Sequence, residues 1–283
     1  MTVTVKQIVF WCLLASVALL TGACSALQPP DANGPRSNLP AYPVLLPEEA
    51  TRQDASLLAW RQLVQRYGVS EKTAPDLQPF TATLHGLPAN LNGSVFLPKV
   101  GAGPNFTEEE LREALRRFIV DWRVLIGADP VQLSLVERTD EKNGDKLARY
   151  EQRPFRYPLR GGFGNLVIRF ASNLRVLDLS SNCLPNAERL QTSLASITPK
   201  VTAEDALNHI TSHSITLTDT AGKQQTFTLA ANTSVTVRQL VVYALPNQNN
   251  ALELHLAWEI DTPNSSFKTV YLDAVDDRVI AGV

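Results

Sequence analysis

Two histidines in this sequence have the spacing of a metal-binding pair. They are His209 and His213, in the stretch HITSH. A zinc peptidase of the zincin class needs H-E-x-x-H, in which the glutamate after the first histidine activates the metal-bound water. Because Ile210 stands at that position, we expect no catalytic zinc. A non-catalytic metal pair stays open, against two ordinary histidines near a helix end, where the helix dipole favours their charge.

The other groups that could do chemistry stand in poor contexts for it. His85 and His255 are isolated along the chain, and we interpret each as structural. The stretch GGFGN at residues 161–165 leads into an expected strand, whereas a phosphate-binding loop leads into a helix N-terminus. We therefore interpret it as a tight strand entry. Cys183 has no nearby His or Lys in the sequence that would lower its pKa, which favours a buried or turn cysteine.

Paired carboxylates and aromatic residues are also accounted for without catalysis. The adjacent acidic pairs fall at expected helix starts and a turn, where capping and solvation explain them; they are Glu48-Glu49, Glu108-Glu109 and Asp276-Asp277. Trp60, Trp122 and Trp258 fall on the inward side of their expected elements, which predicts core positions. We therefore predict that the protein is not an enzyme and has no catalytic residue, cofactor or metal site.

The first residues predict export and a lipid anchor. Residues 8–20 form an apolar block that is shorter than the ~20 residues of a membrane-spanning helix and is typical of a signal peptide. The block leads into Thr21-Gly22-Ala23-Cys24, which resembles the lipobox of bacterial lipoproteins, although Thr21 stands where that family usually has leucine. We predict a signal peptide at residues 1–23 and a lipid on Cys24. An ordinary signal peptide with a coincidental cysteine is the alternative.

Composition and the next residues define the expected setting. Ser25 after Cys24 resembles the outer-membrane sorting pattern, so we expect a lipid-anchored protein of the bacterial envelope that faces the periplasm. Residues 24–47 are rich in proline and are predicted to be an extended tether. With Cys12 lost in the signal peptide and Cys24 lipidated, Cys183 has no disulfide partner. The balance of 26 basic and 28 acidic residues gives no excess of basic residues that would indicate binding to nucleic acid.

The apolar pattern predicts an α+β fold with antiparallel sheets and helices packed on one face. A first helix is expected at residues 47–68, followed by an irregular region with one strand at residues 80–87. The most secure helix is 107–127, with Thr107 and Glu110 as a capping box, and a shorter helix follows Thr202. The expected strands are residues 131–138, 146–152, 164–172, 173–181, 225–230, 236–244, 253–261 and 268–273, with a last turn and edge strand at 276–283.

Two stretches resemble known domains. The first carries Arg149-Tyr150-Glu151-Gln152, Tyr157-Pro158-Leu159, Gly161-Gly162 and then NLVIRF. It resembles the fungalysin/thermolysin propeptide domain, although Arg156 replaces a usual glycine. The second begins with KVTAEDALNHI and closes with FKTVYLDAVDDRVIA, and it is similar to a PepSY domain, although Asp276-Asp277 replaces the customary Thr-Gly turn.

The resemblance implies a division of the chain and a function. It implies two related PepSY/cystatin-like units at residues 107–190 and 191–283, after an N-terminal helix and irregular region at residues 48–106. In secreted metallopeptidases such domains precede a zinc catalytic domain, assist its folding and inhibit it. Because the sequence stops at Val283, directly after the closing hairpin, we expect a free-standing pro-region fold.

The functional expectation is therefore a non-catalytic, membrane-anchored module that binds another protein. The resemblance indicates an inhibitor or folding helper of a secreted zinc metallopeptidase. An accessory or structural envelope lipoprotein without a peptidase partner is the alternative. The membrane would be contacted through the N-terminal lipid.

Overall fold

The structure is a computed structural model that describes residues 41–46, 50–68, 74–88, 91, 95–101, 106–140, 144–212, 214–218, 224–229, 233–247, 251–263 and 265–283. The described residues all belong to one compact unit, Ala41–Val283. The predicted signal peptide, Cys24, His213 and Glu48-Glu49 lie outside the described residues. No helix within the described ranges is long and apolar enough to cross a membrane.

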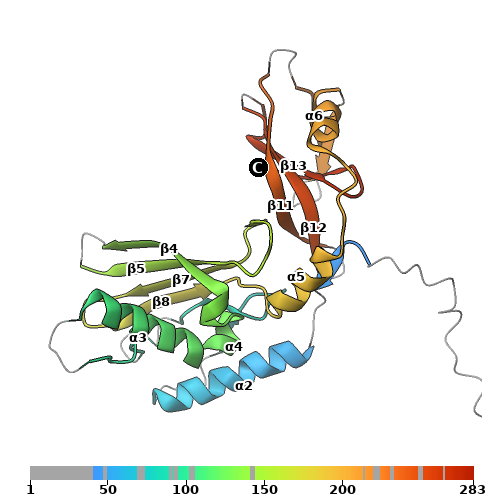
Figure 1. Cartoon of the computed structure of the whole chain (residues 1–283). Coiled ribbons are helices and arrows are strands. Elements are labelled where there is room, and N and C mark those ends of the chain that lie inside the picture. Colours follow the sequence, from blue (N-terminus) through green and yellow to red (C-terminus); the bar gives the residue numbers. More distant parts are fainter. Residues whose placement is uncertain are drawn as a thin grey trace, which may run out of the picture. The chain divides into compact units, whose positions relative to one another are not determined.

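The fold is α+β with antiparallel sheets, as the sequence predicts (Figure 1). The helices are α2 (Ala50–Arg66), α3 (Glu108–Asp121), α4 (Arg123–Ile126), the 3₁₀ helix η2 (Pro130–Gln132), α5 (Ala187–Ala195) and α6 (Ala203–Ser212). The strands are β1 (Val44–Leu46), β2 (Asp76–Leu77), β3 (Leu84–Gly86), β4 (Leu133–Asp140), β5 (Lys146–Gln152), β6 (Leu159–Arg160), β7 (Asn165–Phe170), β8 (Val176–Ser181), β9 (Ile215–Thr218), β10 (Gln224–Phe227), β11 (Thr236–Pro246), β12 (Leu252–Asp261), β13 (Thr269–Asp273) and β14 (Val279–Gly282).

The first sheet contains β4, β5, β7 and β8 in that order, and each neighbouring pair is antiparallel. Along β7 a buried residue alternates with a half-buried one, so one face of the sheet points to the core and the other to solvent. The four strands predicted between residues 131 and 181 are confirmed, with shifts of their ends. The connection between β4 and β5 includes Gly144, which has a positive φ of 86°.

Helix α3 covers the buried face of the first sheet and begins at the predicted capping box (Figure 1). Thr107 Oγ1 accepts the N–H of Glu110 at 3.2 Å, and Glu110 Oε2 accepts the N–H of Thr107 at 2.8 Å. The predicted helix 107–127 is not continuous, because it breaks at Trp122 and resumes as α4. Beyond the break, Leu125 and Ile126 are buried, and Gly127 ends α4 in the left-handed conformation.

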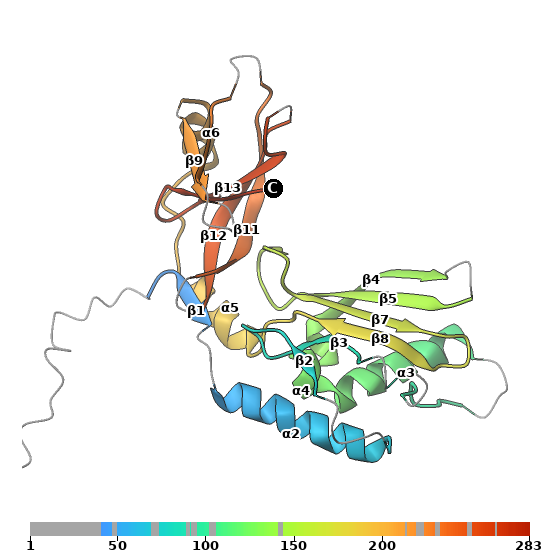
Figure 2. The ribbon, with the colours of Figure 1, turned by 180° about the vertical axis from the view of Figure 1, so that it is seen from behind.

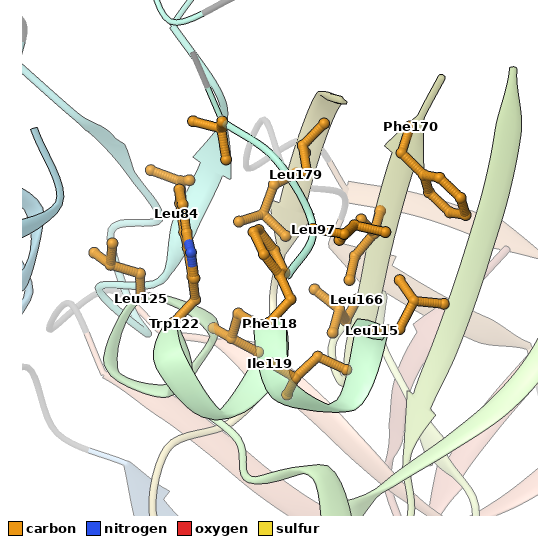
Figure 3. Packing of buried hydrophobic residues seen from close by; sticks show 14 of the residues in the cluster. Leu84, Leu97, Leu115, Phe118, Ile119, Trp122, Leu125, Leu166, Phe170 and Leu179 are labelled. Carbon is orange, nitrogen blue, oxygen red and sulfur yellow. The ribbon is translucent and has the colours of Figure 1, made fainter. Parts of the chain in front are cut away.

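The core of this region lies between α3 and the first sheet (Figure 3). Phe118 is almost fully buried, and its ring stacks on Trp122 with 4.8 Å between centroids. Trp60 brings α2 into the same cluster, which confirms the predicted core positions of Trp60 and Trp122. Full burial of one such large apolar side chain stabilises the fold by roughly 1.5–3 kcal/mol.

The predicted strand at residues 80–87 is too long. Only β3 forms there, because residues 80 and 81 lie in a turn and Ala82 has a positive φ of 53°. The Thr83 hydroxyl donates to the Ser181 carbonyl at 2.7 Å and shares a hydrogen bond with the Thr81 hydroxyl at 2.7 Å. These buried hydroxyls connect the turn to β8. Strand β3 forms only a short hairpin with β2.

The second sheet has the strand order β14-β13-β12-β11-β6, and β1 also pairs with β12 (Figure 2). All pairs are antiparallel except β6 with β11, which is parallel over two positions, Val242 and Tyr243. The strands β11 to β14 are confirmed, whereas β1 and β6 were not predicted. A separate hairpin contains the predicted β10 and the unpredicted β9.

Both helices of this region pack on one face of the second sheet, as predicted. Leu190 and Leu194 of α5 cluster with Leu256 of β12, and Ile210 of α6 clusters with Ile260 of the same strand. Side chains two residues apart on a strand share a face, so Leu256 and Ile260 point the same way. The opposite face of β12 carries no helix within the described chain, and we call it the helix-free face.

The predicted division between residues 107–190 and 191–283 falls inside α5. Leu190 and Leu194, which lie on either side of that division, pack in the same cluster. Helix α5 therefore belongs as a whole with the second sheet. The interpretation of two related units stays a prediction.

The predicted tether at residues 24–47 is corrected at its end. Val44 and Leu46 are buried, and the strand β1 that contains them pairs with β12 between Leu252 and Leu254. The physical reason is a short apolar run, Val44 to Leu46, which is consistent with a strand. Pairing with β12 buries Val44 and Leu46 and leaves Leu45 exposed. Any tether therefore ends before Ala41, and the residues that follow are part of the folded sheet.

Candidate binding site on the second sheet

The helix-free face of β12 carries a row of ionisable side chains. Glu253, His255, Glu259 and Asp261 occupy alternate positions of this strand, with Ala257 between the two pairs. Alternation places all of them on the side opposite α5 and α6. Two of them, His255 and Glu259, are buried. Burying a charged group lowers the stability of the fold unless the group is paired. The hydrogen-bond partners of His255 and Glu259 therefore have to be identified.

Glu259 is held by three donors from three strands. Arg160 Nε of β6 lies 2.8 Å from Glu259 Oε1, Gln239 Nε2 of β11 donates to Oε2 at 2.9 Å, and the Tyr271 hydroxyl of β13 donates to Oε1 at 3.3 Å. Burial acts to raise the pKa of Glu259, but the hydrogen bonds from Arg160 and Gln239 outweigh it and hold this pKa below its ordinary value. The carboxylate thus fastens β6, through Arg160, to the second sheet.

His255 lies between two carboxylates. Its Nδ1 is 2.7 Å from Asp273 Oδ2, and its Nε2 is 3.0 Å from Glu253 Oε2. The Tyr42 hydroxyl donates to Asp273 Oδ1 at 2.9 Å and accepts the N–H of Leu256 at 3.1 Å. Burial acts to raise the pKa of Asp273, but its hydrogen bonds with His255, with two backbone N–H groups and with Tyr42 keep it below its ordinary value. This cluster fastens residues 41–46 to the sheet.

A pocket of about 950 Å³ lies over the helix-free face beside Tyr243 and Tyr271. The two rings lie 4.4 Å apart, and burial raises the pKa of Tyr271 to about 12. The remaining wall comes from residues 151–165, which include the predicted strand entry GGFGN. A Cβ on Gly161 would lie 2.1 Å from the Ala244 carbonyl oxygen, so glycine is required for this segment to approach β11.

Strand β11 has an open edge next to this pocket. Strand β6 pairs with β11 only at Val242 and Tyr243, so residues 236–241 have no strand partner on that side among the described residues. The N–H of Val242 donates to the Pro158 carbonyl at 2.9 Å and therefore points away from β12. The register is unbroken from Leu240 to Val242, so the N–H of Leu240 points away from β12 as well. We call residues 236–241 the β11 open edge.

The residues that the sequence singled out are not brought together. His209 Nδ1 lies 3.1 Å from Asp277 Oδ1, and His213 is not described, so the metal pair stays untested. Cys183 is fully buried, and burial raises the pKa of its thiol to about 12. The loop at residues 161–165 joins β6 to β7 and is a strand entry, as interpreted. Within the described ranges, no group of three His, Cys, Asp or Glu could hold a metal ion.

Sequence reasoning missed the row on β12, although a signal was present. In LELHLAWEID the apolar residues occupy every second position, and the residues between them include Glu253, His255, Glu259 and Asp261. That pattern places several ionisable groups on one face of one strand. The partners Arg160, Tyr42 and Asp273 lie far away in the chain, so no local pattern could have indicated them.

Comparisons with known proteins place the chain only weakly. No protein-family model and no curated protein matches it. Among the solved structures that do match is the Bacillus megaterium YpeB C-terminal domain, at 11% sequence identity, covering 81% of this chain and 95% of that one. The TM-score is 0.29, which is a weak likeness.

Proposed function

We propose that this protein is a non-catalytic binding module that accepts an extended segment of another protein at the β11 open edge. Main-chain hydrogen bonds to a sheet edge give affinity without a particular set of side chains. The supporting observation is the outward N–H of Leu240 beside an unpaired stretch of strand. The large aromatic pocket beside it offers room for side chains of the added segment.

The edge strand of the first sheet, β4, is less suited to this role. Its second half carries Glu137, Arg138 and Asp140, which form ion pairs with Arg149, Glu108 and Lys146 respectively. Charged residues and bulges on an edge strand oppose pairing with another chain. The β11 open edge also contains a bulge, but Arg238 is its one charged residue. We therefore assign strand addition to β11.

The partner that we infer is an exported zinc metallopeptidase, which the protein inhibits or helps to fold. This follows from the resemblance of residues 107–283 to propeptide and PepSY domains. The N-terminal pattern supports a lipoprotein of the bacterial envelope, anchored through Cys24 and facing the periplasm. A lipid at Cys24 and a tether would hold the module at the membrane where exported peptidases emerge.

The binding function is tested with the purified full chain and the zinc metallopeptidases that its own organism exports. Calorimetry and peptide hydrolysis are measured for wild type, Leu240→Pro and Leu135→Pro. Tyr150, which pairs with Leu135, directs its N–H toward β7, so the Leu135 N–H also points outward, from β4. We expect binding that Leu240→Pro abolishes and Leu135→Pro preserves, with both variants folded by circular dichroism. Micromolar wild-type protein that neither binds nor slows any of these enzymes would overturn the proposal.

The lipid anchor has a separate test. Cells that express the full chain are fed a palmitate analogue, and labelling of wild type is compared with Cys24→Ala and Cys183→Ala. We expect label on wild type and Cys183→Ala, and loss of both label and membrane attachment in Cys24→Ala. Equal labelling of all three proteins, or none, would contradict the lipoprotein assignment.

A further inference from the structure

The end of the β11 open edge is flanked by pockets on both faces of the second sheet. The pocket of about 950 Å³ lies on the helix-free face at Tyr243. A smaller pocket of about 270 Å³ includes Val242 and Leu256, which belong to the helix-covered face. Arg156 and Tyr157 line both pockets. They therefore stand where β6 joins β11, between the two faces.

An added strand would send its side chains alternately to these two faces. Alternate pockets beside a sheet edge are what give specificity to strand addition. The residues at this point of the sheet would therefore contact the side chains of the added segment, while the backbone of β11 would form hydrogen bonds with its main chain.

The basic side chains around the larger pocket differ in how they are paired. Arg153 forms an ion pair with Glu151 at 3.0 Å, and Arg160 forms one with Glu259 at 2.8 Å. Arg156 has no acidic partner among the described residues. Its guanidinium carbon lies 5.3 Å from the centre of the Tyr157 ring. A cation held over a ring face keeps its N–H groups available at the edge of the guanidinium plane.

We propose that the segment added to β11 carries an Asp or Glu side chain that binds Arg156, next to a large apolar side chain that enters the pocket at Tyr243 and Tyr271. This inference rests on the proposed function and names the chemistry of the partner. Arginine matches a carboxylate with two parallel N–H···O bonds, which a neutral amide or a lysine in the segment cannot provide. The partner is thus an acidic, extended polypeptide segment.

The test uses synthetic decapeptides with blocked ends, in which Thr and Val alternate and one Phe is followed by Glu, Gln or Lys. Each is labelled with a fluorophore, and binding to the full chain is followed by anisotropy. We expect the Glu peptide to bind about threefold to fivefold more tightly than the Gln peptide, as one exposed ion pair allows. The Lys peptide should bind least well, and the Glu advantage should shrink at high salt.

Variants assign the preference to one residue. Arg156→Glu should reverse the order of the Glu and Lys peptides, whereas Arg112→Glu, at an exposed position of α3, should leave the order unchanged. Leu240→Pro should weaken all three peptides. If all bind equally and Leu240→Pro still abolishes binding, the acidic segment is wrong and strand addition stands. If no peptide binds, this inference is overturned, and the peptidase measurement decides the proposed function separately.

Discussion

The two sheets of this protein bury one face in the same way and differ on the other. In the first sheet, the face opposite α3 carries Arg149 and Arg169, whose ion-pair partners are side chains that solvent reaches. In the second sheet, the face opposite α5 and α6 buries His255 and Glu259 in hydrogen-bonded clusters. Exposed pairs contribute little to stability, whereas buried charged groups depend strongly on their partners.

The edges of the two sheets also differ, because those of the first sheet are charged or covered and the β11 edge of the second is partly unpaired. At the first sheet, β4 is charged along its second half, and β8 is covered by residues 95–97, where Leu97 donates to Leu174 and Val95 accepts from Val176. At the second sheet, polar clusters hold two short segments in place, β6 at the edge of β11 and β1 at β12. Because β6 stops after two residues, the rest of β11 stays open. In the second sheet, buried polar groups therefore hold the short segments that border the long strands.

The largest expected effect comes from the apolar core of the first sheet. Phe118→Ala should lower the free energy of unfolding by about 4 kcal/mol, because it removes a nearly fully buried ring and leaves a cavity. The exposed Leu58→Ala in α2 is the control and should change it by less than about 0.5 kcal/mol. Urea unfolding measures both. A Phe118→Ala cost near that of Leu58→Ala would show that this core does not support the first sheet.

The next effect contrasts one ion pair from each sheet. Arg160→Ala should cost roughly 3 kcal/mol, because it leaves the Glu259 carboxylate buried at 5% exposure without its cation. Arg149→Ala removes a cation whose partner Glu137 is exposed, and should cost less than about 1 kcal/mol. The double variant Arg160→Ala/Glu259→Gln should recover part of the loss in thermal or urea unfolding. Equal costs for Arg160→Ala and Arg149→Ala would remove the contrast between the sheets.

A smaller effect is expected at the junction of residues 41–46 with the second sheet. Tyr42→Phe loses the hydroxyl that donates to Asp273 and accepts from the Leu256 N–H, and should cost about 1–2 kcal/mol. Tyr150→Phe is the matched variant in the first sheet, since the Tyr150 hydroxyl has no hydrogen bond among the described residues. It should be close to neutral by urea unfolding. A Tyr42→Phe cost no larger than that of Tyr150→Phe would show that the hydroxyl does not fasten β1.

The smallest effect is confined to acid solution and follows from the lowered pKa of Asp273. Because the folded pKa lies below the unfolded value of about 3.9, the stabilisation is fully present above that pH and is lost as the pH falls through the folded pKa. The His255 ring and the Tyr42 hydroxyl form hydrogen bonds with this carboxylate. Urea unfolding from pH 6 to pH 2 should show a shallower acid loss in Asp273→Asn than in wild type. Identical acid dependence would contradict the assignment.

Local sequence patterns predicted the elements that have local causes. The capping box of Thr107 and Glu110 marked the start of α3, and alternation marked the strands of both sheets. The break at Trp122 was missed because the helical spacing of apolar residues continues through it, whereas the backbone of Trp122 leaves the helical conformation with φ −102° and ψ 8°. The strand β1 was missed because the proline-rich composition around it outweighed a short apolar run.

The candidate site was harder to predict because it is assembled from distant residues. Arg160 reaches Glu259 and Tyr42 reaches Asp273 across long stretches of chain. The strand β6 has only two residues, so no periodicity in the sequence could indicate it. Openness of an edge is a property of the whole sheet, since it depends on which strand lies beside β11. A single sequence gives no local signal for that.

The most direct test of the central claim is amide hydrogen exchange of the full chain with and without a bound zinc metallopeptidase from its own organism. If an extended segment adds to the second sheet, the N–H of Leu240 should exchange more slowly in the complex, and the N–H of Leu135 on β4 should not change. Slower exchange at Leu135 with none at Leu240, or no change at either edge in a saturated complex, would contradict strand addition at β11.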